Sequence, residues 1–177
     1  MAAPAAADAA HAAHMRRAIE LSRRAGLEER SGKCFGAVVV DESGAVVGEG
    51  YNKVIAESDP TWHAELAAIR EATRRLGRPS LEGCTLYAST LPCPMCTGAI
   101  YWAKVACVYY GADNEDMIRL GVNGGSGDYT RDVFFGREDR LDPPQRARLP
   151  FRQFMREEAA AAHGDYVNLP PGSRAVY

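Results

Sequence analysis

The sequence predicts an α/β protein, a three-layer α/β/α sandwich around a mixed central sheet. Its 177 residues, 46% hydrophobic and 25% charged, suffice for one domain with a single core. Short apolar and β-branched runs alternate with stretches of helical periodicity. The last two expected strands are joined through a helix, which requires a right-handed crossover and places them parallel to each other.

The elements follow from this alternation and from the turn residues between them. We predict strands over residues 34–41, 45–52, 84–89 and 105–111, and helices over residues 14–27, 63–76, 92–103 and 149–162. Residues 1–13 are expected to form a flexible, alanine-rich lead-in, and residues 14–164 a single domain. Residues 165–177 contain two prolines and show no periodicity, so we expect an extended tail.

Charge and cysteine content narrow the class of protein. With 21 Lys and Arg against 23 Asp and Glu, bulk charge does not hold the chain to nucleic acid or to an anionic membrane. No stretch approaches the roughly 20 consecutive apolar residues of a membrane helix. Five cysteines, two of them three positions apart, are unlike a secreted disulfide framework, and the N-terminus does not resemble a signal peptide. We therefore expect a cytoplasmic protein.

Two short motifs at expected helix starts carry the chemistry. Cys93 and Cys96 are spaced i and i+3, so their sulfurs can converge, and a helix N-terminus favours the thiolate form. With His63 from a facing helix they make a site with three protein ligands, which is typical of catalytic zinc because a fourth position stays open for water. Glu65 is then free to take a proton from that water, which zinc acidifies.

Each motif alone has a plainer interpretation. A lone C-x-x-C is equally typical of a structural zinc knuckle or a redox pair, and a lone H-x-E occurs by chance. The combination of H-x-E with P-C-x-x-C about thirty residues later is a signature of zinc deaminases. A non-catalytic binding module that uses zinc only to join two helices is the alternative of another class, and Glu65 argues against it.

Beyond these motifs, residues 14–112 resemble the cytidine deaminase superfamily. The branch with guanine, cytosine and tRNA adenosine deaminases is the most similar. The resemblance is carried by Phe35-Gly36-Ala37, Asn52, Asp59-Pro60-Thr61, His63-Ala64-Glu65 and the run TLPCPMCTGAIYWAKVACVYYGA. It implies a cytidine deaminase-like fold, a homodimer, and zinc-dependent hydrolysis of a ring amine to a carbonyl with release of ammonia.

The resemblance also implies roles for individual residues. His63, Cys93 and Cys96 would hold Zn²⁺, and Glu65 would carry a proton from water to the ring nitrogen and then to the leaving amine. In substrate binding, Asn52 would hydrogen-bond the base edge and Phe35 would underlie the pocket, although a plain core role for Phe35 is an equal alternative. The backbone at Ala64 and Leu91 would contact the ring and its amine.

The substrate is less constrained than the chemistry. Tyr101-Trp102-Ala103 and the C-terminal Tyr177 resemble bacterial guanine deaminases, so we expect conversion of guanine to xanthine, with cytosine or cytidine as the alternative. In guanine deaminases the C-terminal segment can close the partner's pocket, so residues 165–177 are a candidate lid. A tRNA substrate is the weaker alternative: residues 137–156 hold six arginines against three acids but no interleaved aromatic stripe.

Three departures from the family pattern affect these expectations. Cys34 stands where the family usually has proline, and Trp62 where it has a small residue. Guanine deaminases also carry an acidic pair where this chain has Gly121-Val122-Asn123-Gly124, which contains no carboxylate. The candidate substitutes are Asp113, Asp116 and Asp128, and nothing in the sequence selects among them.

Overall fold

The structure is a computed structural model that describes residues 4–122, 149–170 and 172–175 of the chain. Its centre is a five-stranded sheet in the order β2-β1-β3-β4-β5. The strands are β1 (Gly36–Val40), β2 (Val46–Tyr51), β3 (Thr85–Thr90), β4 (Cys107–Ala112) and β5 (Phe151–Gln153). Strand β1 is antiparallel to both β2 and β3, whereas β3, β4 and β5 run parallel. The sheet is therefore mixed, as the sequence predicted.

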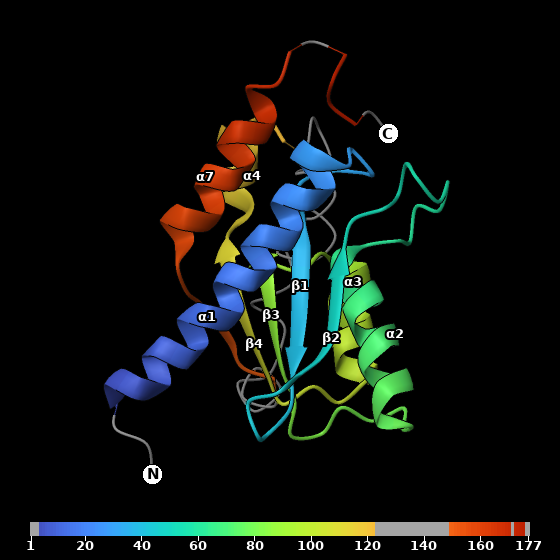
Figure 1. Cartoon of the computed structure of the whole chain (residues 1–177), viewed down its shortest axis with the longest axis vertical. Coiled ribbons are helices and arrows are strands. Elements are labelled where there is room, and N and C mark those ends of the chain that lie inside the picture. The colour runs from blue at the N-terminus through green and yellow to red at the C-terminus, as the bar shows by residue number, and fades with distance from the viewer. Residues whose placement is uncertain (1–3, 123–148, 171, 176–177) are drawn as a thin grey trace, which may run out of the picture.

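Helices cover both faces of this sheet (Figure 1). One face carries α1 (Pro4–Arg23), α4 (Asn114–Arg119) and α7 (Arg156–Val167), and the other carries α2 (Ala64–Leu76) and α3 (Pro94–Trp102). Alternate residues of β1 serve the two layers: Val38 and Val40 face α1 and α7, whereas Ala37 and Val39 face α2 and α3. Each layer thus has its own apolar cluster, and the three-layer α/β/α sandwich is confirmed.

Two glycines of β2 bring helix α2 unusually close to the sheet. A Cβ atom at Gly48 would overlap the Ala68 carbonyl oxygen, and one at Gly50 would overlap the Ala64 carbonyl oxygen. The bare backbone of β2 therefore contacts the bare backbone of α2. This contact fixes how far the N-terminus of α2 lies from the sheet. His63 is the residue at that N-terminus.

The outer elements differ from the sequence-based expectation. The first helix begins at Pro4, so residues 4–13 are helical and not a flexible lead-in, and a five-residue π-helix, η1 (Arg24–Glu28), continues it. The helix expected over residues 149–162 is instead the short strand β5 followed by α7. Because α7 extends to Val167, the expected extended tail is helical over residues 165–167.

Helix α4 was not expected, although its sequence contains the cap. The Asp113 side chain accepts a hydrogen bond from the Asp116 amide, and the Asp116 side chain accepts one from the Asp113 amide, which makes a capping box. None of the helices among the described residues combines the length and apolar character needed to cross a membrane.

Candidate active site

The predicted site residues meet at one edge of the sheet. Strands β3 and β4 end at this edge, β2 also ends there, and the antiparallel β1 begins there. Helices α2 and α3 both start at the same edge, directly after His63 and Cys93. Two positive helix ends thus point at one place, which favours negatively charged side chains or ligands between them.

His63, Cys93 and Cys96 form a group that can hold a metal ion. Nδ1 of His63 lies 3.5 Å from the Sγ atom of Cys93 and 3.5 Å from that of Cys96. Their donor atoms all lie within 4.8 Å of one another. One imidazole and two thiolates are the ligands that zinc prefers, and three protein ligands leave the fourth tetrahedral position open. The donor set therefore fits a catalytic zinc ion.

The backbone turns these ligands toward each other. His63 and Cys93 are the N-cap residues of α2 and α3, with extended backbone angles, and neither side chain caps its own helix. Pro94 occupies the first turn of α3, where its missing N–H costs nothing. Cys96 follows one turn along and is fully buried. The i and i+3 spacing thus places both sulfurs beside the imidazole.

The pKa values of the ligands reflect this close approach. The hydrogen bond from the Cys96 thiol lowers the pKa of Cys93 to about 4, with further help from His63. The same contact, together with burial, raises the pKa of Cys96 well above its usual value. Burial alone would lower the pKa of His63, but the hydrogen bond to Cys93 and the nearby Glu65 raise it. The contacts among the three side chains thus stabilise Cys93 as a thiolate.

Glu65 lies beside the three ligands in the first turn of α2 and is buried. Burial raises its pKa, and the neighbouring Cys93 raises it further, while His63 acts in the opposite direction. A carboxyl group whose pKa is raised in this way holds a proton more readily than an ordinary glutamate and can still return it. Its place next to the metal group, but outside it, suits a proton carrier.

Asn52 and Phe35 reach the site edge from the adjacent strands. Asn52 is fully buried, and its Oδ1 atom accepts a hydrogen bond from the Val54 amide at 3.2 Å. Its backbone amide donates to the Phe35 carbonyl at 3.0 Å, so the two residues are held together. A side chain at Gly32 would overlap the Asn52 carboxamide. The structure therefore fixes the Asn52 side chain through its surroundings.

Ala64 and Leu91, the two residues expected to contribute backbone contacts, also lie at this edge. Ala64 is the first residue of α2 and is fully buried. Leu91 directly follows β3, and its amide donates to the Ala112 carbonyl at 2.8 Å. The Leu91 carbonyl is thus placed by the sheet itself, two residues before Cys93.

The candidate substitutes for the missing acidic pair have other structural roles. Asp113 caps α4. Asp116 is 1% exposed and accepts hydrogen bonds from Arg119 at 2.7 Å and Arg156 at 2.8 Å. Burial would raise the pKa of Asp116, but the hydrogen bonds from Arg156 and the Asp113 amide, together with the charges of Arg156 and Arg119, lower it. Both carboxylates are thus committed to holding α4, and Asp128 lies outside the described residues, as do Asn123, Gly124 and most of residues 137–156.

Cys34, which stands where the family usually has proline, faces the layer of α1 and α7. Its Sγ atom lies 3.5 Å from the Ala162 carbonyl oxygen of α7, and burial raises the pKa of the thiol to about 11. Cys34 is therefore a small buried residue between the start of β1 and α7. It has no place in the metal group.

Sequence reasoning missed two titratable residues near the site. The positive charge of Lys33 acts on His63, and burial lowers the pKa of Lys33. His163 on α7 is fully buried and contacts Phe35. The spacing of the buried residues Ala159, Ala162, His163 and Tyr166 would have revealed this helix face, had the helix been placed correctly.

Comparison with known proteins agrees with this geometry. Residues 8–112 match the family model of the cytidine and deoxycytidylate deaminase zinc-binding region. The chain belongs to this family. Its members are zinc-dependent hydrolases that act on C–N bonds, so the chain is a zinc-dependent deaminase by family.

Individual relatives are similar over most of the chain. A guanine deaminase of Bacillus subtilis is 41% identical over 144 residues, which cover 81% of this chain and 85% of that protein. The solved guanine deaminase of Nitrosomonas europaea superposes with a TM-score of 0.72 at 26% identity, covering 96% of this chain and 87% of that one. A mutant protein solved with 8-azaguanine gives a TM-score of 0.70 at 26% identity, covering 88% and 82%.

Proposed function

We propose that this deaminase acts on a free nucleobase and converts guanine to xanthine with release of ammonia. The observation that carries the proposal is the single edge where Glu65, the three candidate ligands and the buried Asn52 meet. The similarity to guanine deaminases over 81% of the chain supports guanine over other amino-heterocycles.

In this proposal His63, Cys93 and Cys96 would hold Zn²⁺, which would supply the Lewis acidity that activates the attacking water. Glu65 takes a proton from that water on its carboxylate and delivers it to the ring nitrogen next to the reacting carbon. It would then take the second proton from the hydroxyl now bonded to that carbon and pass it to the amine, so that the C–N bond breaks, ammonia leaves and the carbon becomes a carbonyl. Its raised pKa suits both steps, because the same group must accept and donate.

The remaining residues orient the base. Asn52 hydrogen-bonds the base edge, Phe35 supports the ring, and the backbone at Ala64 and Leu91 contacts the ring and its amine. Burial of Asn52 excludes water from this contact, which strengthens discrimination against bases that lack the matching group.

The experiment is a measurement of ammonia release by the zinc-loaded protein from guanine, guanosine, cytosine, cytidine and adenine. We expect guanine to give the highest kcat/KM. Turnover of cytosine or cytidine alone would contradict the guanine assignment and favour the pyrimidine branch. Silence on all small molecules, with turnover of a tRNA adenosine, would contradict the proposal as a whole.

We further propose that two copies of the chain associate through α3. Met95, Tyr101 and Trp102 leave an exposed apolar face on this helix, and Trp102 is 83% exposed. Exposed aromatic side chains of this size are typical of protein interfaces. Because Met95 lies between the ligands Cys93 and Cys96, this dimer would place the two sites near the interface.

The C-terminal tail is proposed as a lid over a pocket, its own or that of the partner. The tail leaves α7 at the edge of the sheet where the site lies (Figure 1). The Tyr166 hydroxyl donates to the Ala175 carbonyl at 3.3 Å, which ties the tail back to α7.

We also infer a cytoplasmic location, because the two ligand cysteines must stay reduced to bind zinc. A nucleic-acid partner is not part of this proposal.

A further inference from the structure

A buried histidine packs against Phe35, the residue proposed to support the substrate ring. His163 comes from α7 and has no exposed surface. Its Nε2 atom shares a hydrogen bond of 2.7 Å with the Thr90 hydroxyl, and its ring centre lies 5.4 Å from that of Phe35 at an angle of 51°. One imidazole thus contacts both the residue that ends β3 and the residue that precedes β1.

Both contacted residues adjoin segments that hold site residues. Thr90 is followed by Leu91, Pro92 and the ligand Cys93, so the position of Thr90 sets where this loop begins. Phe35 accepts the backbone hydrogen bond of Asn52. A shift of the His163 ring would therefore move the pocket floor and the Leu91 carbonyl together.

An imidazole is a costly residue for this place. Among the described residues, the Nδ1 atom of His163 has no hydrogen-bond partner. A buried polar atom left in this state destabilises the fold, whereas a leucine of similar size would carry no such cost. Packing alone does not explain the histidine, and its hydrogen bond to Thr90 remains as the specific contribution.

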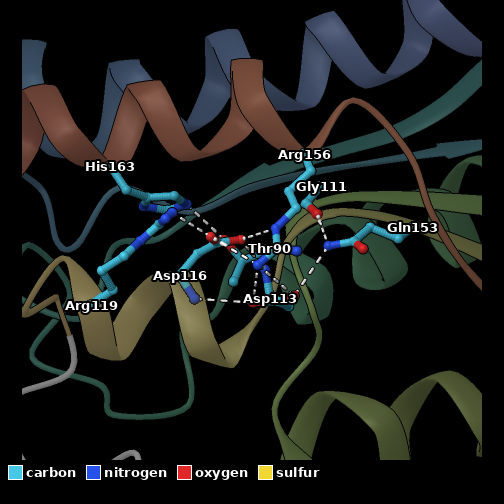
Figure 2. Close-up of polar contacts among 8 residues, drawn as sticks. All are labelled: Thr90, Gly111, Asp113, Asp116, Arg119, Gln153, Arg156 and His163. Atoms are coloured by element: carbon cyan, nitrogen blue, oxygen red, sulfur yellow. Dashed lines mark hydrogen bonds and ion pairs between the residues drawn. The ribbon is translucent and has the colours of Figure 1, made fainter.

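Burial keeps this imidazole neutral. Burial lowers the pKa of His163 to about 4, although the Asp116 carboxylate acts in the opposite direction. Figure 2 shows His163 pointing from α7 toward the centre where Asp116, Arg119 and Arg156 meet. Because the two arginines already pair with Asp116, its carboxylate is compensated without a protonated histidine. The neutral ring keeps one nitrogen as donor and one as acceptor.

We propose that His163 is a positioning residue of the deaminase. Its hydrogen bond to Thr90 and its contact with Phe35 hold the pocket floor and the Leu91 loop in fixed positions relative to each other. These positions determine which base fits. This inference rests on the proposed nucleobase deaminase function. His163 touches neither the substrate nor the zinc ligands and acts only through Thr90 and Phe35.

The test compares three substitutions of His163 in the full-length, zinc-loaded protein. His163→Gln places an amide where Nε2 lies and can keep the Thr90 hydrogen bond, whereas His163→Asn places its amide near Nδ1 and cannot. His163→Leu removes both polar atoms. We expect kcat/KM per bound zinc to fall about 10- to 100-fold in the Asn and Leu variants, and Gln to restore most of it.

A second readout separates positioning from loss of fold. The ratio of kcat/KM for guanine to kcat/KM for 2,6-diaminopurine does not depend on how much protein is active. We expect this ratio to change in the Leu and Asn variants and not in the Gln variant. Thr90→Val should change it in the same way, and the double variant Thr90→Val, His163→Leu should be no worse than either single change.

The outcomes distinguish this inference from the function on which it rests. If all variants keep the turnover of the wild-type protein and its ratio of kcat/KM for guanine to that for 2,6-diaminopurine, the role of His163 is overturned while the proposed function stands. Strictly additive losses in the double variant would have the same meaning. Absence of both base turnover and 8-azaguanine binding in the wild-type protein would overturn the proposed function and this inference together.

Discussion

His63 and Cys93 occupy the positions where a helix usually has a capping serine or aspartate, yet neither side chain caps its helix. Both are turned to the space between α2 and α3, where they meet Cys96. Ligand identity and spacing were predictable from sequence because these residues are short-range features of two helix starts. Their convergence also agrees with the sequence-based prediction, since both helices begin at one edge of the sheet.

Gly32 illustrates a residue whose importance only the structure reveals. Its missing side chain makes room for the Asn52 carboxamide. We predict that Gly32→Ala displaces Asn52, retains zinc and lowers kcat/KM for guanine by about 10-fold or more. Steady-state kinetics with metal analysis provide the measurement. Gly164→Ala is the matched control, because an added methyl there meets nothing within 4 Å; equal kinetics in the two variants would contradict a placement role for Gly32.

At the scale of elements, strands with β-branched runs and the helix after His63 were predictable, because local pattern and burial agree there. The region after Ala112 was not. Strand β5 has only three residues, Phe151–Gln153, and depends on pairing with β4 for its existence. The buried face of α7 consists of Ala159, Ala162, His163 and Tyr166, which a search for large apolar residues does not find.

Asp116 joins α7 to α4, another helix that the sequence analysis did not predict. Its carboxylate accepts from Arg119 on its own helix and from Arg156 at the start of α7. We predict that Asp116→Asn lowers the free energy of unfolding by about 2 kcal/mol, because a neutral amide replaces a buried, charge-assisted acceptor. The pH dependence of kcat should stay unchanged, since Asp116 is paired and does not relay protons.

Denaturant unfolding and a pH–rate profile provide the two measurements for Asp116. Asp165→Asn is the control, because its ion pair with Arg23 lies on the surface and should contribute less than about 1 kcal/mol. A lost limb in the pH–rate profile of Asp116→Asn, without loss of stability, would instead make Asp116 the missing proton relay.

At the scale of the whole molecule, the exposed face of α3 predicts self-association. We expect light scattering after gel filtration to give twice the chain mass for the wild-type protein and the monomer mass for Trp102→Glu. A charge placed in an apolar interface is costly when it has no partner. Ile118→Glu, at another exposed apolar residue, should leave the dimer intact. A monomeric wild-type protein would contradict the proposed interface.

The structure also shows where the tail can be cut without damage to the core. Tyr166 is buried, and Leu169 packs against the same apolar cluster, so a cut before residue 166 would unfold this layer. We predict that a chain ending at Leu169 keeps its zinc and its unfolding midpoint but loses most guanine turnover, because the pocket stays open to water. Full turnover in this shortened chain would exclude the tail as a lid.

The central claim is that Glu65 moves protons beside a zinc ion that His63, Cys93 and Cys96 hold. The most direct measurement is zinc content and ammonia release for Glu65→Gln beside the wild-type protein. The account predicts equal zinc content, because Glu65 is not a ligand, and a loss of turnover of at least about 100-fold, because an amide cannot carry the proton. Loss of zinc with surviving ammonia release would contradict it.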